Sequence, residues 1–596
     1  MPTSPLVSVV AALLAGQPAP HSTPINIQYE VTFTRSTAAT RTLQVAMRFA
    51  VEDPGPVLLS LPAWTPGAYE ISNFAKSMAE FHATSRGVEL HWDKADFDTW
   101  RLDVPAPGSV EVRFTVSADH LDNAMAWSKA DFLFVNGTNI FLYPEGRGTD
   151  IKADVTVTTE ADWLVVTGLP ALSKGHFVAS NYHDLVDMPF FIGKIDVDSA
   201  LVDGKQHRVA SYPAGALTGG ARQLFWSQLK ATVPVMAKVF GETPWDNYST
   251  LLLFDGDFAG GAALEHQNSH LGIYNPGFIG TPILASITAH EIFHAWNVKR
   301  LRPADMVPYR YDQPQPSTLL WVSEGITDYY ADLALVRAAV VDSTGFLDLT
   351  ADKIREVSAA PAVALEDASL STWIQPTDGT ATIYYPKGSL AGLLIDIMIR
   401  DGSDNKSSLD DVMRALYQRA YKTGRGFTTE EWWQVVAEFA RQGDFSDFSR
   451  RYVDGREPFP YAKIAPLAGF RYVADSIHEP RIGVGTTTMD GAREVVTNVI
   501  AGSAAADAGV QLGDELISIG DIKANPTFGA AFRTQYRARI GEKIPVVLRR
   551  DGNPMTVTMA VRETVRVEER LEYDRRATLK ATRIRQGILR GTTEHP

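Results

Sequence analysis

Two histidines with a glutamate between them form the stretch of this sequence that has the clearest chemical meaning. The residues are His290, Glu291 and His294. At about 3.6 residues per helical turn, positions 290 and 294 share one face, so both imidazoles can reach one metal ion. Glu291 projects about 100° round from His290, near enough to reach a water on that ion. Zinc bound by such a pair lowers the pKa of its water to about 7 and polarises a carbonyl, as amide hydrolysis requires.

The residues around this motif predict a buried helix. Thr281 and Pro282 supply an N-cap and a first-turn proline, and Arg302-Pro303 is expected to end the helix, which would place the histidines near its middle. The apolar side chains that leave little of this helix polar are Ile283, Leu284, Ile287, Ile292, Phe293 and Trp296. Burying two histidines and a glutamate unpaired would cost several kcal/mol. One metal ion accounts for all three together, whereas a hydrogen-bonded core histidine accounts for one at a time.

A catalytic zinc site needs a third protein ligand and an open fourth position. Glu324 is the predicted third ligand, in the segment 321–330 that opens a second apolar helix. Asp328 follows four residues later on the same face, where it can accept the second ring N–H of a ligating histidine. The alternative is two solvated carboxylates favoured by the helix dipole. Because the sequence contains no cysteine, zinc must be bound by nitrogen and oxygen.

A zinc helix followed by a helix with the sequence Trp-x-x-Glu-Gly resembles the thermolysin-like gluzincin metallopeptidases. The wider match is to the glycyl aminopeptidase family, and it is carried by residues 62–69, 294–303 and 384–388. The resemblance implies an N-terminal β domain, a thermolysin-like catalytic domain, a C-terminal PDZ domain and a preference for N-terminal glycine or alanine. His294 and Glu324 are farther apart than in simpler gluzincins, and the proline-rich loop in this interval is expected to lie beside the metal and narrow the cleft.

A glycine-rich stretch after an apolar strand is predicted to hold the substrate. Gly260 and Gly261 would allow a peptide to approach the strand edge and add to the sheet as an extra strand. In related aminopeptidases such an edge strand ends in a glutamate that binds the substrate's α-ammonium group, and Glu265 resembles that residue. The alternative is a surface glutamate in a loop. His266 and His270 are expected to line the cleft or lie at the surface, because no helical spacing connects them to the zinc pair.

A tyrosine is predicted to stabilise the oxyanion of the reaction. Tyr385, in its Tyr-x-Lys-Gly setting, resembles the tyrosine that related aminopeptidases direct at the tetrahedral intermediate. A phenol stays protonated at neutral pH and can donate to an oxyanion. Tyr384 remains the alternative, because neighbours in an extended segment point in opposite directions. Tyr329 and Tyr330 are expected to be packing residues.

Length and charge limit the classes of protein to consider. A chain of 596 residues is expected to hold about three or four domains. The net charge of −14 argues against nucleic acid as a partner, and no apolar run reaches the ~18–20 residues of a membrane span. Residues 1–22 are a possible signal segment, although they lack a basic start and a clear cleavage site. We therefore expect a periplasmic or secreted protein, with a cytoplasmic location as the alternative.

The sequence pattern predicts a multidomain α+β fold. Short alternating polar and apolar runs separated by turn residues predict an antiparallel β-sandwich at residues 23–205. Helical periodicity follows, with a helix at residues 221–240 and a capping box at Thr428 and Glu431. We expect residues 206–465 to form the mostly helical, thermolysin-like peptidase domain.

Residues 466–562 resemble a bacterial-type PDZ domain. The resemblance rests on residues 481–485, 501–510 and 512–520. In such domains the N–H groups of the glycine-bearing loop can capture the terminal carboxylate of a peptide beside an open sheet edge. The charged segment 563–596 is expected to be an amphipathic or disordered tail.

The sequence therefore predicts a zinc aminopeptidase with one zinc ion per chain, acting on peptides with a free N-terminus. Glu291 would take a proton from the metal-bound water and pass it to the leaving amine. One alternative is an endopeptidase in which Glu265 merely lines the cleft, and another is a peptide-binding adaptor with an idle metal site. Because every candidate catalytic residue lies between positions 260 and 388, deletion from Phe470 onward is expected to leave cleavage of small amides.

Overall fold

The protein divides into two compact units. The larger unit ends at Phe470 and resumes at Tyr573, and the smaller unit is the insertion Arg471–Glu572. The residues that the computed structural model describes are 22–441, 444–489 and 493–594. Apart from Ser22, the possible signal segment at residues 1–22 lies outside the described residues.

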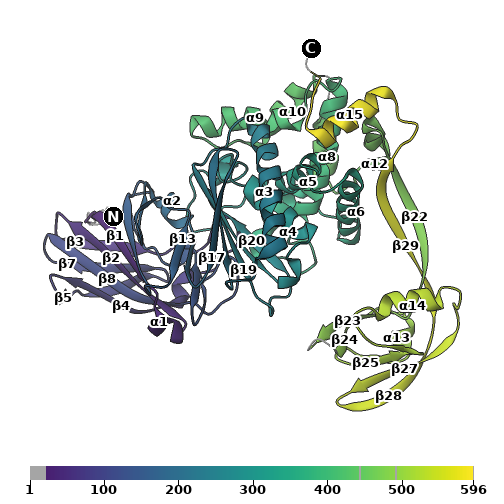
Figure 1. Ribbon diagram of the computed structural model, residues 1–596, viewed down its shortest axis with the longest axis horizontal. Coiled ribbons are helices and arrows are strands. Elements are labelled where there is room, and N and C mark those ends of the chain that lie inside the picture. Colours follow the sequence, from purple (N-terminus) through teal and green to yellow (C-terminus); the bar gives the residue numbers. More distant parts are fainter. Residues whose placement is uncertain (1–21, 442–443, 490–492, 595–596) are drawn as a thin grey trace, which may run out of the picture. The chain divides into compact units, whose positions relative to one another are not determined.

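A β-rich N-terminal part precedes a mostly helical part in the larger unit, so the multidomain α+β prediction is confirmed (Figure 1). The largest sheet contains, in spatial order, β14 (Ala171–Ser173), β15 (His176–Ala179), β12 (Ala153–Thr158), β1 (Ile25–Thr32), β2 (Thr42–Val51), β8 (Gly108–Ser117), β4 (Met78–Ser85) and β5 (Val88–Glu89). Alternate residues of β8 are buried, because successive side chains of a strand point to opposite faces. The sheet is mixed rather than antiparallel, since β1 pairs in parallel with β12.

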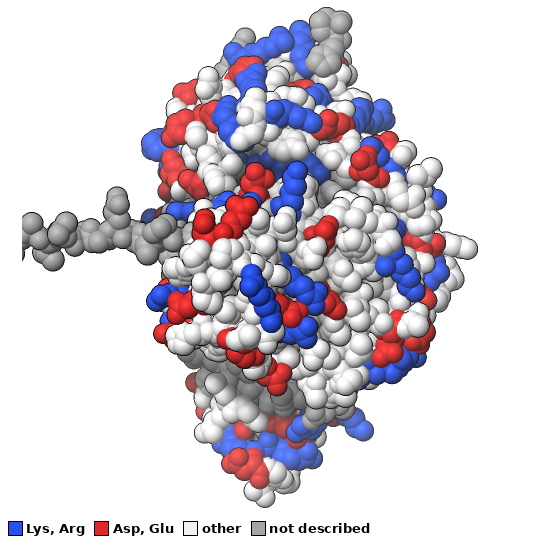
Figure 2. Space-filling model, turned by 90° about the vertical axis from the view of Figure 1, so that its left-hand side faces the viewer, with Lys and Arg blue, Asp and Glu red and all other residues white. Residues whose placement is uncertain are grey.

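Two four-stranded sheets complete the β-rich part. The first contains β13 (Leu164–Thr167), β16 (Phe190–Gly193), β10 (Phe132–Val135) and β9 (Trp127–Lys129). The second contains β11 (Tyr143–Pro144), β3 (Gly55–Ser60), β7 (Thr99–Val104) and β6 (Trp92–Asp96). Figure 2 shows the face of the molecule on the left of Figure 1, where Lys and Arg side chains are interspersed with Asp and Glu side chains.

A five-stranded sheet connects the β-rich part to the helices. In spatial order it contains β17 (Asp196–Val202), β18 (Lys205–Tyr212), β19 (Asn247–Phe254), β21 (Ser269–Tyr274) and β20 (Gly261–Glu265). Phe132 and Phe191 of the neighbouring sheet share one buried cluster with Leu251 and Leu271 of this sheet. This common core fixes the β-rich part against the sheet whose edge strand is β20.

The helices that follow agree with several sequence-based expectations. Their bounds are α3 (Gly219–Phe240), α4 (Pro282–Phe293), α5 (Ile326–Arg337), α6 (Ser343–Ala359), α7 (Leu365–Ser371), α8 (Tyr384–Gly402), α9 (Leu409–Arg419) and α10 (Thr429–Ala440). Helix α3 covers the predicted segment 221–240, and Thr428 and Glu431 form the predicted capping box of α10. Helices α4 and α8 both pack against α5. Among the described residues, no helix is both long enough and apolar enough to cross a membrane.

The smaller unit is built on a six-stranded sheet with its own apolar core. Its strands are β23 (Val484–Met489), β24 (Arg493–Val499), β25 (Glu515–Ile519), β26 (Ile522–Lys523), β27 (Lys543–Arg550) and β28 (Asn553–Ala560). Two helices, α13 (Ala504–Asp507) and α14 (Phe528–Tyr536), contribute Ala505 and Phe532 to the core. A separate pair of long strands, β22 (Phe470–Arg481) and β29 (Arg562–Tyr573), connects the insertion to the rest of the chain.

The charged segment 563–596 was expected to be either an amphipathic or a disordered tail. It contains nearly all of β29 and the helix α15 (Leu579–Arg590). Helix α15 packs against α5 and α8 and buries Ile584 and Ile588. Arg337, the last residue of α5, donates through Nε to the carbonyl of Ile588 at 3.0 Å. Arg400 of α8 donates to the carbonyl of Thr592 at 2.9 Å. The end of the chain therefore belongs to the helical core.

The expectation that deletion from Phe470 onward leaves cleavage of small amides stays a prediction, but this deletion also removes α15, which packs on α5 and α8. The buried side chains of Arg337 and Arg400 would lose the carbonyl acceptors that this segment provides. The apolar surface of α5 and α8 that α15 covers would become exposed. The amphipathic alternative for this segment pointed to an apolar stripe, but not to the helices on which the stripe packs.

We predict that the insertion is dispensable and the terminal helix is not. Replacing residues 471–572 with a short Gly-Ser linker should leave cleavage of small amides within a few-fold of wild type, because Phe470 and Tyr573 lie next to each other, with ring centroids 5.9 Å apart. Ending the chain at residue 470 should lower the free energy of unfolding by at least ~3 kcal/mol, from two isoleucines at ~1.5–3 kcal/mol each and two arginine N–H groups that lose their carbonyl acceptors. Denaturant titrations and initial rates measure both. Equal stability of the two shortened proteins would contradict the role given to α15.

Candidate metal centre and active site

Helix α4 carries the two histidines at its end rather than at its middle. Thr281 caps it by accepting from the N–H of Leu284, and Pro282 is its first residue, as predicted. The helix ends at Phe293, nine residues before the expected stop at Arg302. His294 is the C-cap and keeps right-handed helical dihedrals, φ −59° and ψ −23°, so the one-turn spacing of the imidazoles survives.

The chain leaves α4 early because the residues after His294 connect the two ligand-bearing segments. The Nδ1 of His294 lies 2.7 Å from the carbonyl oxygen of Asn297, which directs Nε2 away from the loop. The side-chain amide of Asn297 donates to the carbonyls of Val322 and Ser323 at 2.9 and 3.2 Å. A continuous helix would not bring this amide to the segment that carries Glu324.

Glu324 lies in a π-helical turn, Trp321–Gly325, that leads into α5. A Cβ on Gly325 would stand 2.5 Å from the Cα of Gly388 and 2.7 Å from the carbonyl oxygen of Tyr384. Only glycine permits this approach of the two backbones. The glycines of the Trp-x-x-Glu-Gly and Tyr-x-Lys-Gly motifs therefore meet, and their meeting brings the start of α8 to the site.

The ligand atoms of the three predicted metal-binding residues converge. The Nε2 atoms of His290 and His294 are 2.9 Å apart, and Oε2 of Glu324 is 3.5 and 3.1 Å from them. All three ligand atoms lie within 4.8 Å of one another. The donors are two imidazoles and one carboxylate, which is the set that catalytic zinc sites with an open position use. The three residues therefore provide a donor set that fits a zinc ion.

The electrostatics of this cluster favour a cation at its centre. Burial opposes charge on His290, but hydrogen bonds to Asp328 and Glu324 raise its pKa to about 10. Burial also opposes ionisation of Glu324, but His294 and His290 hold its pKa far below its usual value. The site thus stabilises positive charge at the imidazoles, and a divalent ion can supply that charge.

Asp328 lies behind His290, as expected for a residue that orients a ligand. Its Oδ1 is 3.7 Å from Nδ1 of His290, and its Oδ2 is 2.7 Å from Nζ of Lys353 on α6. Burial raises the pKa of Asp328, but the ammonium group of Lys353 and the imidazole of His290 outweigh burial and lower it to about 2. Sequence reasoning missed Lys353, because nothing in its sequence surroundings distinguishes it from a surface lysine.

Glu291 lines the same cavity and is buried with its Oε2 free of hydrogen bonds to the described residues. Burial raises its pKa to about 7, although the two histidines act in the opposite direction. A carboxyl group with a pKa near neutrality can take up a proton and release it again at physiological pH. Its position one residue after His290 places it at the edge of the ligand cluster.

Glu265 is the last residue of β20, the edge strand of the five-stranded sheet, and it is buried rather than part of a surface loop. Gly260 precedes the strand and Gly261 opens it. The Oε1 of Glu265 has no hydrogen-bond partner among the described residues, and Nζ of Lys299 is 3.9 Å away. Burial raises the pKa of Glu265, with Lys299 opposing. The structure thus brings an incompletely paired carboxylate into the cavity that the metal-binding residues line.

His266 and His270, which were expected to line the cleft or lie at the surface, are both fully buried. The Nδ1 of His266 is 3.5 Å from Asp187, and Nδ1 of His270 is 3.2 Å from the hydroxyl of Tyr248. Neither histidine lines the cavity. The expectation was wrong because both histidines have partners in the interior: His266 lies beside Asp187 of the β-rich part, and His270 lies beside Tyr248 of the neighbouring strand β19.

The two candidate tyrosines begin helix α8 and do not form an extended segment, so the argument from opposite directions was wrong. Tyr385 lines the cavity, and its ring centroid is 5.9 Å from that of His290. The hydroxyl of Tyr384 is 3.3 Å from Thr372 in a buried position outside the cavity lining. Burial and the nearby charge of Glu324 hold the pKa of Tyr385 well above its usual value, so its hydroxyl stays protonated.

The cavity itself is about 250 Å³. The residues that line it are Gly67, Gly261, Ala263, Glu265, Ser286, Ile287, His290, Glu291, His294, Glu324, Asp328 and Tyr385. The proline-rich loop at residues 307–316 is absent from this lining, contrary to the expectation that it narrows the cleft. It instead packs on residues 62–69, where Ala63 donates to the carbonyl of Tyr311 at 2.7 Å and Trp64 donates to that of Arg310 at 2.8 Å.

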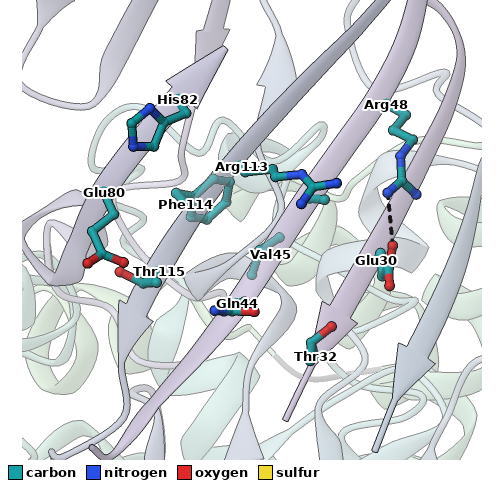
Figure 3. A pocket seen from close by; sticks show the side chains of 11 residues that line it. Glu30, Thr32, Gln44, Val45, Arg48, Glu80, His82, Arg113, Phe114 and Thr115 are labelled. Atoms are coloured by element: carbon teal, nitrogen blue, oxygen red, sulfur yellow. Dashed lines mark ion pairs between the residues drawn. The ribbon is translucent and has the colours of Figure 1, made fainter. Parts of the chain in front are cut away.

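A larger hollow of about 530 Å³ lies on one face of the eight-stranded sheet (Figure 3). Arg48 pairs with glutamates of the two neighbouring strands, and Arg113 pairs with Glu111 of its own strand. Arg48 is 3.0 Å from Glu30 and 2.7 Å from Glu111, and Arg113 is 3.0 Å from Glu111. This hollow contains no set of convergent ligands or unpaired buried carboxylates, so the chemistry is assigned to the smaller cavity.

Two family models match the chain. The N-terminal domain model of peptidase M61 matches residues 28–194, and the M61 glycyl aminopeptidase model matches residues 284–391. The fold and the site therefore define a zinc metallopeptidase of the aminopeptidase type. The resemblance to the M61 glycyl aminopeptidase family that the motifs predicted is confirmed over these two stretches of the chain.

Solved structures provide a separate comparison of the fold. An aminopeptidase N family protein from Idiomarina loihiensis is 24% identical, with a TM-score of 0.81 over 94% of this chain and 100% of that chain. An M1 zinc metallopeptidase from Deinococcus radiodurans is 16% identical, with a TM-score of 0.46 over 73% of this chain and 95% of that chain. No curated protein matches the sequence.

We predict that substitutions of Glu324 and Glu291 will separate metal binding from turnover. Glu324→Gln replaces an anionic ligand with a neutral one. It should weaken zinc binding by more than ~100-fold, because substitution of a residue that only orients a ligand already weakens metal binding by ~10- to 100-fold. Glu291→Gln keeps all three ligands and should hold zinc almost normally, while kcat/KM falls by ~10²–10⁴, the usual contribution of a general acid–base group. Competition with a chromophoric chelator and initial rates measure the two effects. Loss of zinc from the Glu291 variant would contradict this division.

Proposed function

We propose that this peptidase binds one zinc ion per chain through His290, His294 and Glu324, and that it removes the first residue of peptides, with a preference for glycine or alanine. The observation that carries the proposal is the convergence of three ligand atoms beside a buried, incompletely paired Glu265 in one cavity. The match of residues 284–391 to the M61 glycyl aminopeptidase model supports the preference for small first residues. The cavity volume of about 250 Å³ is consistent with a short side chain.

The metal would be held by the two Nε2 atoms and by Oε2 of Glu324, with Asp328 orienting the ring of His290. Zinc at such a centre acidifies water and polarises a carbonyl oxygen. Glu291 takes a proton from the attacking water and returns it to the leaving amine. Its pKa of about 7 supports both steps, since neither the charged nor the neutral form is strongly favoured at neutral pH. Tyr385, which stays protonated, donates a hydrogen bond to the oxygen that gains negative charge.

Glu265 would bind the α-ammonium group of the substrate. An ammonium group supplies the partner that Oε1 lacks, because a charge-assisted hydrogen bond satisfies a buried carboxylate. The backbone of the substrate would lie along β20, where Gly260 before the strand and Gly261 at its start carry no side chains that would keep a second backbone away. A substrate held in this way presents its first carbonyl to the metal centre, which limits cleavage to the first peptide bond.

Three further proposals concern the layout of the chain. Residues 23–205 form an N-terminal β-sandwich domain, and residues 206–465 form a thermolysin-like peptidase domain. Residues 466–562 form a PDZ domain that binds the C-terminus of a peptide. The six-stranded sheet of the smaller unit and the left-handed backbone of Gly483, at φ +89°, are consistent with a carboxylate-binding loop at residues 481–485. We also propose a periplasmic or secreted location, which the apolar segment 6–15 supports.

We predict that Glu265→Gln will reduce kcat/KM for free-amine substrates by ~10- to 300-fold, because it removes a charge-assisted bond of roughly 1.5–3 kcal/mol, and more when the ammonium group is left buried and unpaired, at ~1.4 kcal/mol per decade. Zinc content should not change, because Glu265 is not a ligand. Discrimination between unblocked and N-acetylated glycyl amides should fall in parallel. The measurement is the ratio of initial rates on the matched pair of substrates.

Glu242→Gln is a suitable control, because Glu242 pairs with Lys422 and Tyr417 and does not line the cavity. It should leave both the rate and the discrimination unchanged. Retention of the normal preference for free amines by the Glu265 variant would contradict the anchor. Wild-type cleavage of acetylated peptides at internal bonds would instead identify an endopeptidase with the same metal centre.

A further inference from the structure

The segment 62–69 of the β-rich part reaches the active-site cavity, and we call it the arm. It follows β3 and is held on several sides. The hydroxyl of Thr65 is 2.5 Å from that of Thr138, and Lys299 donates to the carbonyl of Pro66 at 3.1 Å. Its side chains Trp64, Thr65 and Tyr69 are buried. The arm is therefore a fixed part of the interior rather than a surface loop.

Two residues of the arm touch the two carboxylates of the site. The hydroxyl of Tyr69 donates to Oε1 of Glu324 at 2.6 Å. A Cβ on Gly67 would come within 2.5 Å of Oε2 of Glu265, so the backbone of the arm lies directly against that side chain. One short segment thus contacts both the expected metal ligand and the expected amine anchor.

The contact with Tyr69 gives the two oxygens of Glu324 different partners. Oε1 accepts from the phenol, while Oε2 lies 3.1 and 3.5 Å from the Nε2 atoms of His294 and His290. A phenol keeps its proton at neutral pH. Tyr69 is therefore a permanent donor to Oε1, and a hydrogen bond to a carboxylate is among the stronger ones in proteins.

The backbone of Tyr69 is also unusual. Its φ of 50° lies in the left-handed region, which is unfavourable for a bulky side chain. Such a residue persists when its surroundings fix it, and these positions gather at functional sites. Here Ala68 donates to the carbonyl of Thr65 at 3.0 Å, and the Tyr69 ring lies 6.2 Å from that of Trp373. The chain accepts this strained conformation at the residue whose phenol reaches Glu324.

We propose that Tyr69 is a positioning residue of the metal centre, whose phenol occupies Oε1 of Glu324 so that Oε2 is the oxygen presented between the two histidines. Residues that orient ligands commonly contribute to metal affinity, because they fix the ligand before the metal arrives. The β-rich domain is thereby a component of the metal site. This inference rests on the zinc centre proposed above, and it adds a residue that neither contacts the cavity nor resembles a ligand by spacing.

The test is the affinity of the metal-free protein for zinc, measured by competition with a chromophoric chelator. Tyr69→Phe removes only the hydroxyl, and zinc affinity should weaken by ~10- to 100-fold. The melting temperature of the metal-free variant should stay within a few degrees of wild type. The matched control is Tyr311→Phe, because Tyr311 is also a buried phenol beside the arm, and its hydroxyl is 2.7 Å from Nδ1 of His183. Zinc affinity should be unchanged in this control.

A second variant covers the case in which Tyr69→Phe does not fold. Tyr69→His keeps an aromatic ring with an N–H donor, and histidine tolerates the left-handed region better than most residues. Its zinc affinity should lie between that of the wild type and the ~10- to 100-fold weaker affinity expected when the hydrogen-bond donor is lost. Normal zinc binding by Tyr69→Phe, or equal weakening by Tyr69→Phe and Tyr311→Phe, would overturn the inference while leaving the proposed function intact. A wild-type protein that binds no zinc would overturn the proposed function itself.

Discussion

The structure depends on one electrostatic constraint, which is the burial of two imidazoles and three carboxylates around a single point. The Nε2 atoms of His290 and His294 stand 2.9 Å apart with Oε2 of Glu324 beside them, and Glu291 and Asp328 complete the group. Such a cluster is costly to bury unless positive charge is placed at its centre. A divalent cation balances the group, and the surrounding elements can be understood as the means of holding these side chains in place.

Each element supplies one part of that arrangement. The early end of α4 frees Asn297 to join the loop to the Glu324 segment, and the contact between Gly325 and Gly388 brings α8 and its tyrosine to the site. Helix α6 contributes Lys353 behind Asp328, and α15 covers the far side of α5 and α8. The β-rich part reaches in through the arm. The active site is therefore shared by segments far apart in the sequence, and its stability depends on packing that extends to the C-terminus.

The sequence was informative where spacing alone determines geometry. The histidine pair and the position of Asp328 follow from helical periodicity, Glu324 was recognised by its Trp-x-x-Glu-Gly setting, and the capping signals of α4 and α10 were recognisable because they are local. Contacts between distant segments could not be found in this way. Tyr69 and Lys353 act across large sequence separations, and His266 is buried beside Asp187, which lies much earlier in the sequence. The early end of α4 was hidden for the same reason, since it serves a tertiary contact of Asn297.

The most direct test of the account is zinc X-ray absorption spectroscopy on the purified full-length protein, combined with metal analysis. The account predicts about one zinc ion per chain, with two imidazole nitrogens at about 2.0–2.1 Å and oxygen ligands in the rest of the first shell. His294→Ala should remove one imidazole contribution and most of the bound zinc. Active wild-type protein without stoichiometric zinc, or an imidazole contribution that the substitution leaves unchanged, would contradict the assignment of the metal centre.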